Sequence, residues 1–270
     1  MDRTPPMEIL ETLRREVNFG CPVANCGVPY LTWHHFSPPW RVREHHDPKG
    51  MIALCHTHHD MAEGCRWTVE QLRQMKSQPF ITGDSISASY DYLRRKVVCK
   101  VGNLAYNARN VLEIDGERVL GFERDGQGYD RLNVLIRGKD NSIILEMKNN
   151  FWTVFLPTIY DLRCSAQGKE MEIRTKDAQT RFEMRFDELT QDNLGAQFPS
   201  THIEEFIEAI GNPAVIPVWT IKGKLRWGSQ WLEIHESEVR DLQHGSTVSG
   251  TILLNPRSGF SYSKDEFSVG

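Results

Sequence analysis

Residues 21–35 read CPVANCGVPYLTWHH, and residues 54–59 read LCHTHH. The window from Cys21 to Cys65 holds seven of the ten histidines of the chain and four of its six cysteines. Imidazole and thiolate are common ligands of borderline transition metals. We therefore expect this window to decide the local fold and to carry the chemistry of the protein.

The first expected metal site is a structural zinc. Cys21-x4-Cys26 and Cys55-x2-His58 together form a four-ligand set of the kind that tetrahedral zinc prefers. The residues between the two pairs can form a strand, a loop and a second strand that bring the chain back to the same point. Zinc would then stabilise a segment too short to build a large core. The alternative is that the two pairs are unrelated and the thiols are simply buried.

Local patterns predict two strands and a helix around these pairs. Leu31 to Phe36 is short and aromatic, and Met51 to Leu54 is a short apolar run, so both favour strands. Residues 56–63 contain no helix breaker and predict a helix that ends at Gly64. The zinc pairs would thus be joined by a strand–loop–strand unit that leads into a helix.

Three histidines remain once the zinc set is assigned: His34, His35 and His59. Adjacent residues on a strand point to opposite faces, so only one of His34 and His35 can reach a given metal. On a helix, His58 and His59 lie about 100° apart, so one can face the zinc while the other faces away. Taken singly, each of the three would be a surface or half-buried imidazole.

The ordered set resembles the HNH nucleases, whose ββα-metal fold is two strands and a helix around one catalytic metal. The resemblance covers about a sixth of the chain, between Cys21 and Gly64. The residues that carry it are, in order, Cys21, Cys26, His34, His35, Cys55, His58 and His59.

The resemblance implies a role for each of the remaining polar residues. His34 and His59 would bind the catalytic divalent metal, which is Mg²⁺, Mn²⁺, Ni²⁺ or Zn²⁺. Glu63, one helical turn after His59, would be a further ligand. His35 would activate water as the general base. The implied activity is a phosphodiester hydrolase acting on nucleic acid, with DNA favoured over RNA.

One position departs from the family pattern. The motif asparagine that ties down the loop and orients the base is replaced by Gly50. His45, His46 or Asp47 are close enough in sequence to supply the lost contact, although His45 and His46 also fit a solvated polar loop. Gly50 favours the main alternative, a non-catalytic zinc module that binds nucleic acid or protein.

Composition limits the partners of the protein. The net charge is −4, from 32 basic and 36 acidic residues, so nucleic-acid binding must come from a local patch or a bound metal. The chain has no run of eighteen apolar residues, which argues against a membrane partner. The N-terminus lacks the apolar stretch of a signal peptide, so a cytoplasmic location is expected. Cys99 and Cys164 fit buried thiols.

The whole chain predicts an α+β fold in two parts. Residues 1–80 form the HNH-like module, and the Ser-rich stretch 80–89 is the expected linker. Residues 90–270 predict a larger antiparallel β-rich domain, because short apolar strands alternate with turn signals. Pro217 would make the strand from Val215 to Ile221 an edge strand.

The β-rich part carries no catalytic signature in its sequence, and its histidines His202, His235 and His244 are scattered. It fits a recognition or sensing module, or a domain for homo-oligomerisation. A further alternative is that the β-rich domain senses a small ligand and the zinc-binding segment is its structural appendix.

Overall fold

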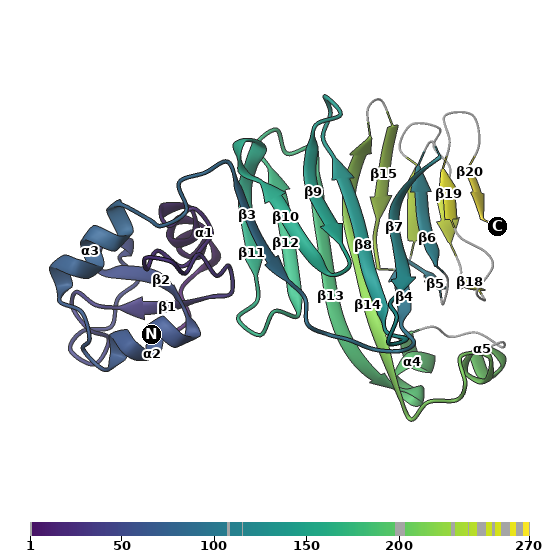
Figure 1. Ribbon diagram of the computed structural model, residues 1–270, viewed down its shortest axis with the longest axis horizontal. Coiled ribbons are helices and arrows are strands. Elements are labelled where there is room, and N and C mark those ends of the chain that lie inside the picture. Colours follow the sequence, from purple (N-terminus) through teal and green to yellow (C-terminus); the bar gives the residue numbers. More distant parts are fainter. Residues whose placement is uncertain are drawn as a thin grey trace.

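The computed structural model describes residues 2–106, 109–114, 116–197, 203–227, 230–236, 238–241, 247–249, 252–254, 260–262 and 267–269. His202 and His244 lie outside these ranges. The protein has an α+β fold: a small mixed module is followed by two large sheets (Figure 1). None of the helices in the described ranges is long and apolar enough to cross a membrane.

The N-terminal module is a hairpin with three helices around it. Strand β1 pairs with β2 in antiparallel register, from Leu31 opposite Cys55 to His35 opposite Met51. Helix α2 follows β2 without a gap, as the sequence predicts, and ends at Gly64. The elements are α1 (Met7–Glu16), β1 (Leu31–His35), the 3-10 turn η1 (Pro48–Gly50), β2 (Met51–Cys55), α2 (His56–Glu63) and α3 (Val69–Ser77).

A separate small core holds this module together. Strand β2 is buried along its whole length, because α1 and α2 both pack against the hairpin. Leu13 and Val17 of the α1 segment and Leu72 of α3 join it there. Thr68 caps α3 by accepting from the Gln71 N–H, while the Gln71 side chain accepts from the Thr68 N–H. Local capping and a shared apolar interior thus fix the hairpin and helix that carry the histidines.

The rest of the chain is a sandwich of two sheets. The first sheet has the strand order β20-β19-β6-β7-β8-β9-β10-β3, and β6 to β9 form the predicted antiparallel meander. Its strands are β3 (Ser85–Ser89), β6 (Asn110–Ile114), β7 (Glu117–Arg124), β8 (Asp130–Arg137), β9 (Ile143–Lys148), β10 (Phe151–Phe155), β19 (Phe260–Tyr262) and β20 (Phe267–Val269).

The second sheet has the order β11-β12-β13-β14-β15-β16-β17, and β4 pairs in parallel with the first half of β14. Strand β5 pairs with β4, and β18 pairs with β5. The bounds are β4 (Val98–Val101), β5 (Leu104–Tyr106), β11 (Ile159–Cys164), β12 (Glu170–Thr175), β13 (Arg181–Thr190), β14 (Val215–Trp227), β15 (Gln230–Ile234), β16 (Glu238–Asp241), β17 (Thr247–Ser249) and β18 (Ile252–Leu254). A second 3-10 turn, η2 (Leu156–Thr158), joins β10 to β11.

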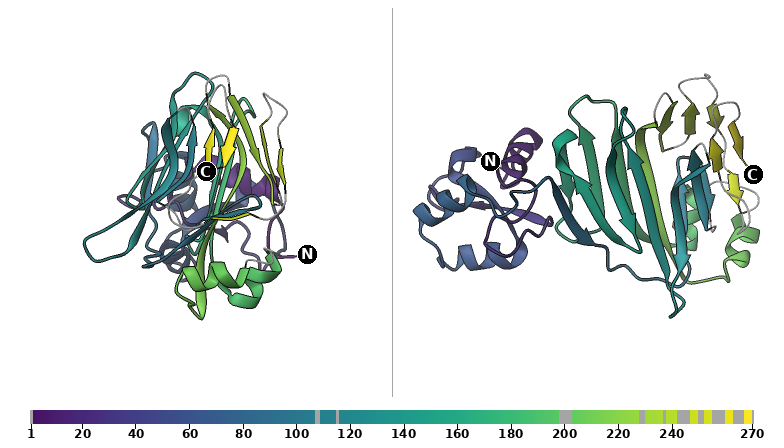
Figure 2. Two further views of the ribbon diagram at one scale, coloured as in Figure 1. Left: turned by 90° about the vertical axis from the view of Figure 1, so that its right-hand side faces the viewer. Right: turned by 45° about the horizontal axis from the view of Figure 1, so that its top comes forward.

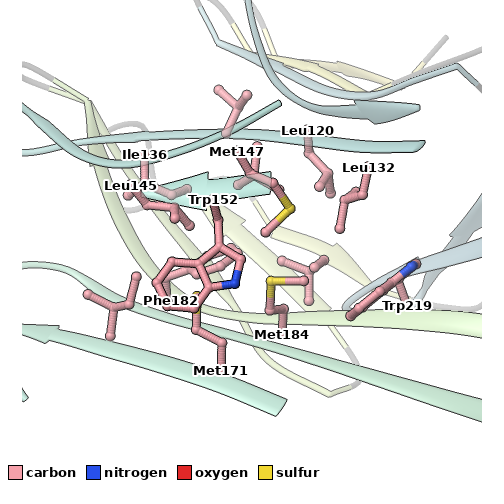
Figure 3. Close-up of a cluster of buried hydrophobic side chains, with 14 of the residues drawn as sticks. Leu120, Leu132, Ile136, Leu145, Met147, Trp152, Met171, Phe182, Met184 and Trp219 are labelled. Carbon is pink, nitrogen blue, oxygen red and sulfur yellow. The ribbon is translucent and has the colours of Figure 1, made fainter. Parts of the chain in front are cut away.

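The main core fills the space between the two sheets (Figure 3). Strand β13 shows the period-two pattern: Phe182 and Met184 point inward, while Arg181 and Arg185 are exposed. Trp152 of the first sheet and Trp219 of the second are both almost fully buried. Cys99 and Cys164 also lie in this core, which confirms them as buried thiols.

Two helices cover one end of the second sheet on its outer face. Helices α4 (Gln191–Gln197) and α5 (Ile203–Ala209) contribute Leu194, Phe206 and Ile207 to a third apolar cluster. Val98 of β4 and Val218 of β14 complete it from the sheet. The views in Figure 2 show both helices gathered at this end of the sandwich.

Three predictions in the second part of the chain are wrong. The β-rich domain is not antiparallel throughout, because β4 pairs in parallel with β14, β18 with β5 and β19 with β6. Half of the expected linker, Ser85–Ser89, is strand β3, paired with β10 at the edge of the first sheet. Only Ile86 of this strand is fully buried, so the other positions tolerate serine. The Pro217 strand is not an edge strand, because β14 lies between β13 and the pair β4 and β15. The proline is tolerated because pairing with β4 begins only at Val218.

The N-terminal module is fixed to one end of the sandwich. Arg14 of α1 donates from Nε and Nη2 to the two carboxylate oxygens of Asp161 in β11, at 2.9 and 2.7 Å. Phe19 belongs to the main core, and Tyr30 Oη donates to the Ser89 carbonyl at 2.7 Å. Figure 1 shows the module beside β3 and β11. The two parts of the chain therefore share a buried junction.

Candidate metal centre and active site

The predicted zinc set comes together in the folded chain. The ligand atoms of Cys21, Cys26, Cys55 and His58 all lie within 4.8 Å of one another. Cys26 Sγ is 3.8 Å from Cys55 Sγ, and His58 Nδ1 is 3.3 Å from the sulfur atoms of Cys21 and Cys55. In a tetrahedral site with Zn–S bonds of about 2.3 Å, two sulfur atoms are about 3.8 Å apart. The donor types and their spacing therefore fit a structural zinc.

Local structure explains how the four ligands meet. Asn25 and Gly27 have φ values of 63° and 64°, and these left-handed residues turn the chain so that Cys26 returns toward Cys21. Cys55 is the last residue of β2, and His58 lies in the first turn of α2. The strand-to-helix transition therefore supplies one pair of ligands, and the preceding tight turn supplies the other.

The protonation states of the bare ligands determine how metal binding depends on pH. Burial raises the pKa of the Cys21 and Cys55 thiols, so both keep their protons at pH 7 until a metal displaces them. Burial lowers the pKa of His58, so its ring is available in the neutral, ligating form. Metal binding at this cluster would therefore release protons and depend on pH.

A second ligand set lies on the other side of α2. His34 Nδ1 is 3.3 Å from Glu63 Oε1, and His59 Nε2 is 3.8 Å from the same oxygen. The rings of His34 and His59 are perpendicular, with centroids 5.5 Å apart. Two imidazoles and one carboxylate suit divalent Mn, Ni and Zn, and the carboxylate also suits Mg. Three protein ligands leave coordination positions open, as catalytic metal sites require.

Neighbouring histidines thus serve different clusters, as the strand and helix periods predict. His58 contacts the cysteines, while His59 faces His34 and Glu63. His34 is buried, and this burial lowers its pKa, although the nearby Glu63 carboxylate opposes the shift. The neutral ring of His34 is therefore favoured for metal binding.

His35 faces a different set of neighbours from His34. Its ring centroid lies 4.7 Å from that of Trp40 and 5.2 Å from that of His45. His35 is only 5% exposed, and neither of its ring nitrogens has a hydrogen-bond partner among the described residues. Burial, assisted by the adjacent His45, lowers the pKa of His35 to about 4. The ring is therefore neutral at pH 7 and has a free proton-accepting nitrogen.

His45 is a buried structural residue of the loop rather than a solvated one. Its Nδ1 accepts from the Asp47 N–H at 3.1 Å, so its Nε2 carries the proton that is donated to the Pro38 carbonyl at 2.9 Å. These two hydrogen bonds connect the start of the loop between β1 and β2, at Pro38, to its end, at Asp47.

Steric crowding explains why position 50 is a glycine. A Cβ atom at Gly50 would overlap the carbonyl oxygen of Ser37 and lie 2.9 Å from Cε1 of His45. The Gly50 carbonyl accepts from the N–H groups of Phe36 and Ser37, which holds these backbones close together. The absence of a side chain at Gly50 therefore leaves room for the ring of His45.

Two members of the second ligand set share one pocket of about 410 Å³ with His35. His34, His35 and Glu63 line it, and Arg3 reaches Glu63 Oε1 with its Nη2 at 3.4 Å. Sequence reasoning missed Arg3, because nothing in its local sequence links it to a site so far along the chain. The complete lining is Arg3, His34, His35, Phe36, Pro39, Trp40, Arg41, Ala62, Glu63, Cys65, Trp67, Val69 and Leu72.

Every residue assigned to a metal or catalytic role in the sequence lies in one of these two clusters or in the shared pocket. His56 is exposed, and His46 packs beside Trp40 with ring centroids 5.4 Å apart. Trp40 lies over His35 and not in the small core. Comparison of the chain with protein families, with curated proteins and with solved structures found no match.

Proposed function

We propose that the protein is a metal-dependent endonuclease of the HNH type that hydrolyses phosphodiester bonds, with DNA favoured over RNA as the substrate. The observation that carries this proposal is the ligand set His34, His59 and Glu63, two members of which, His34 and Glu63, line the same pocket as the buried ring of His35. A purely structural zinc module needs only the separate Cys21–His58 cluster.

The residues of the pocket divide the chemistry between them. His34, His59 and Glu63 would hold a divalent metal ion, which stabilises charge on the phosphate and on the leaving 3′ oxygen when bound. His35 would take a proton from the attacking water at whichever ring nitrogen faces it. The low pKa of His35 keeps this ring neutral, and an anionic phosphate beside it would raise that pKa toward the pH of the reaction.

Local groups would bind the substrate, because the net charge of −4 gives no general attraction to nucleic acid. Arg3 and Arg41 line the pocket and are exposed, so both can contact backbone phosphates. Trp40 is half-buried beside His35 and presents an aromatic face on which a base can stack. The structural zinc would hold β1, β2 and α2 in the arrangement that the pocket needs.

Incubation of supercoiled plasmid with the zinc-loaded protein tests the proposal. Nicking should require added Mg²⁺, Mn²⁺ or Ni²⁺. His35→Ala should slow nicking by about 10²–10⁴-fold, because a general base contributes that much. His56→Ala is the matched control, since this histidine is exposed and lies on the same helix as His59.

The outcomes separate the proposal from its rivals. Equal nicking by wild type and His35→Ala would remove His35 from the mechanism. Absence of nicking on plasmid and on RNA with all three metals would overturn the endonuclease assignment. A gel-shift assay with the same nucleic acids would then identify a non-catalytic zinc module by retained binding.

A further inference from the structure

A second pocket lies on the outer face of the sandwich, remote in sequence from the histidine cluster. It has a volume of about 360 Å³ and is lined by Lys100, Arg185, Gln197, Thr220, Lys222 and Glu236. This volume falls within the range of about 300–1,000 Å³ that is typical of small-molecule sites. The endonuclease proposal uses none of these residues.

Strand register places three of the polar side chains in one row. Thr220 of β14 is paired with Arg185 of β13 on one side and with Lys100 of β4 on the other. Lys222 lies two residues further along β14 and therefore points to the same face. The long-range pairing of β4 with β14 thus gathers three cations, and 122 positions of sequence separate Lys100 from Lys222.

Lys100 is the distinctive member of this row. The residue is only 8% exposed, because it adjoins the apolar cluster under α4 and α5. Its Nζ donates to Gln197 Oε1 at 3.5 Å, near the end of α4. A lysine is rarely buried to this extent. Two further cations, Arg185 and Lys222, line the same pocket.

The charge of the pocket favours an anion. Lys100, Arg185 and Lys222 give three positive charges, and Glu236 is the one acid among the described residues that line the pocket. Glu236 pairs with Lys222 and is 74% exposed, and Arg185 Nε is 2.6 Å from Asp187 Oδ2 just outside the pocket. Burial lowers the pKa of Lys100; Glu236 opposes this shift, whereas Lys222 and Arg185 add to it. A bound anion would relieve the repulsion between these cations.

We propose that this pocket binds the phosphate group of a small phosphorylated ligand of nucleotide size. Lys100 and Arg185 would donate charge-assisted hydrogen bonds to the phosphate oxygens, and the Thr220 hydroxyl lies between them as a third donor. Lys222 would contribute charge after partial release from Glu236. The β-rich domain would thus be a ligand-binding domain as well as a support for the N-terminal module.

Isothermal titration of the full-length, zinc-loaded protein with inorganic pyrophosphate and with ATP tests this assignment. Lys100→Met keeps the length and apolar stem of the side chain, and it should weaken binding at least about tenfold, because one charge-assisted bond is lost. Glu236→Gln should strengthen binding, because it removes the acid of the pocket. Lys224→Gln is the matched control, since Lys224 lies on the same strand but packs on Trp231.

The results distinguish the site from the candidate active site. Tighter binding of ATP than of pyrophosphate would support a ligand of nucleotide size, and the reverse would overturn that part of the proposal. Binding that is unchanged by Lys100→Met would place the anion elsewhere, for example at the histidine pocket, and would overturn the proposal. Lack of binding of both probes at millimolar concentration would overturn it as well. Thermal unfolding of each variant shows whether its fold is intact.

Discussion

The buried ion pair between Arg14 and Asp161 should hold the N-terminal module against the sandwich. Both side chains are almost completely buried, at 2% and 3% exposure, and they form two hydrogen bonds of 2.9 and 2.7 Å. Replacing Arg14 with methionine leaves the Asp161 carboxylate buried with a weakened set of partners. Removal of one partner from a buried pair costs about 3–5 kcal/mol.

A second cation reduces the expected loss. Arg174 Nη2 is 3.0 Å from Asp161 Oδ2, and its side chain is 31% exposed. Asp161 therefore keeps one charged partner in Arg14→Met, and the loss should lie near the lower limit, at about 3 kcal/mol. For a chain of this size, that loss corresponds to a fall in melting temperature of about 6–12 °C.

Chemical denaturation and thermal unfolding, followed by tryptophan fluorescence and circular dichroism, measure this effect. Arg15→Met is the matched control: Arg15 is the exposed neighbour that stacks on Tyr160, so its loss should cost less than about 1 kcal/mol. The double variant Arg14→Met/Asp161→Leu should recover much of the stability, because neither charge is then left buried alone. A loss below about 0.5 kcal/mol in Arg14→Met, or a double variant less stable than the sum of the singles, would refute the reasoning.

Three further predictions concern the N-terminal module. Cys55→Ala should abolish zinc retention and unfold the module. Cys65→Ala is the control, because this cysteine is exposed and lies outside the zinc set, so zinc retention and folding should be unchanged. Metal analysis measures the bound zinc, and circular dichroism measures the folding. Because the pKa of His35 in the free protein is about 4, nicking at DNA concentrations far below KM should keep its rate from pH 8 to about pH 5.5 and fall only as His35 is protonated. Half-loss near pH 6.5 in folded protein under these conditions would contradict this. Gly50→Asn introduces the asparagine of the HNH motif, and it should lower the free energy of unfolding by about 1–3 kcal/mol, because the added Cβ overlaps the Ser37 carbonyl oxygen. An unchanged free energy of unfolding would show that the loop relaxes around the new side chain.

Sequence patterns predict the local parts of the fold well. The spacing of the Cys and His pairs, the apolar runs of β1 and β2 and the uninterrupted α2 all act over short distances, and the structure places them as expected. The different neighbours of His34 and His35 fit the strand period in the same way. The meander β6 to β9 is predicted because each strand pairs with its neighbour in the sequence.

Long-range features could not be read from the sequence. Strand β3 is polar because it lies at a sheet edge, so its serines resemble a linker. The burial of His45 depends on backbone groups of Pro38 and Asp47, which have no recognisable motif. The parallel pairing of β4 with β14 joins segments far apart in the chain, and only that pairing brings Lys100 to Arg185.

Metal counting tests the central claim most directly. Wild-type protein dialysed against buffer should retain one zinc ion and bind one further, exchangeable Mn²⁺ ion, measured by elemental analysis and electron paramagnetic resonance. His59→Ala should keep the zinc and lose the Mn²⁺, whereas His58→Ala should lose the zinc. Mn²⁺ binding that survives in both His59→Ala and His34→Ala, or zinc loss in His59→Ala, would contradict the assignment of two separate metal sites.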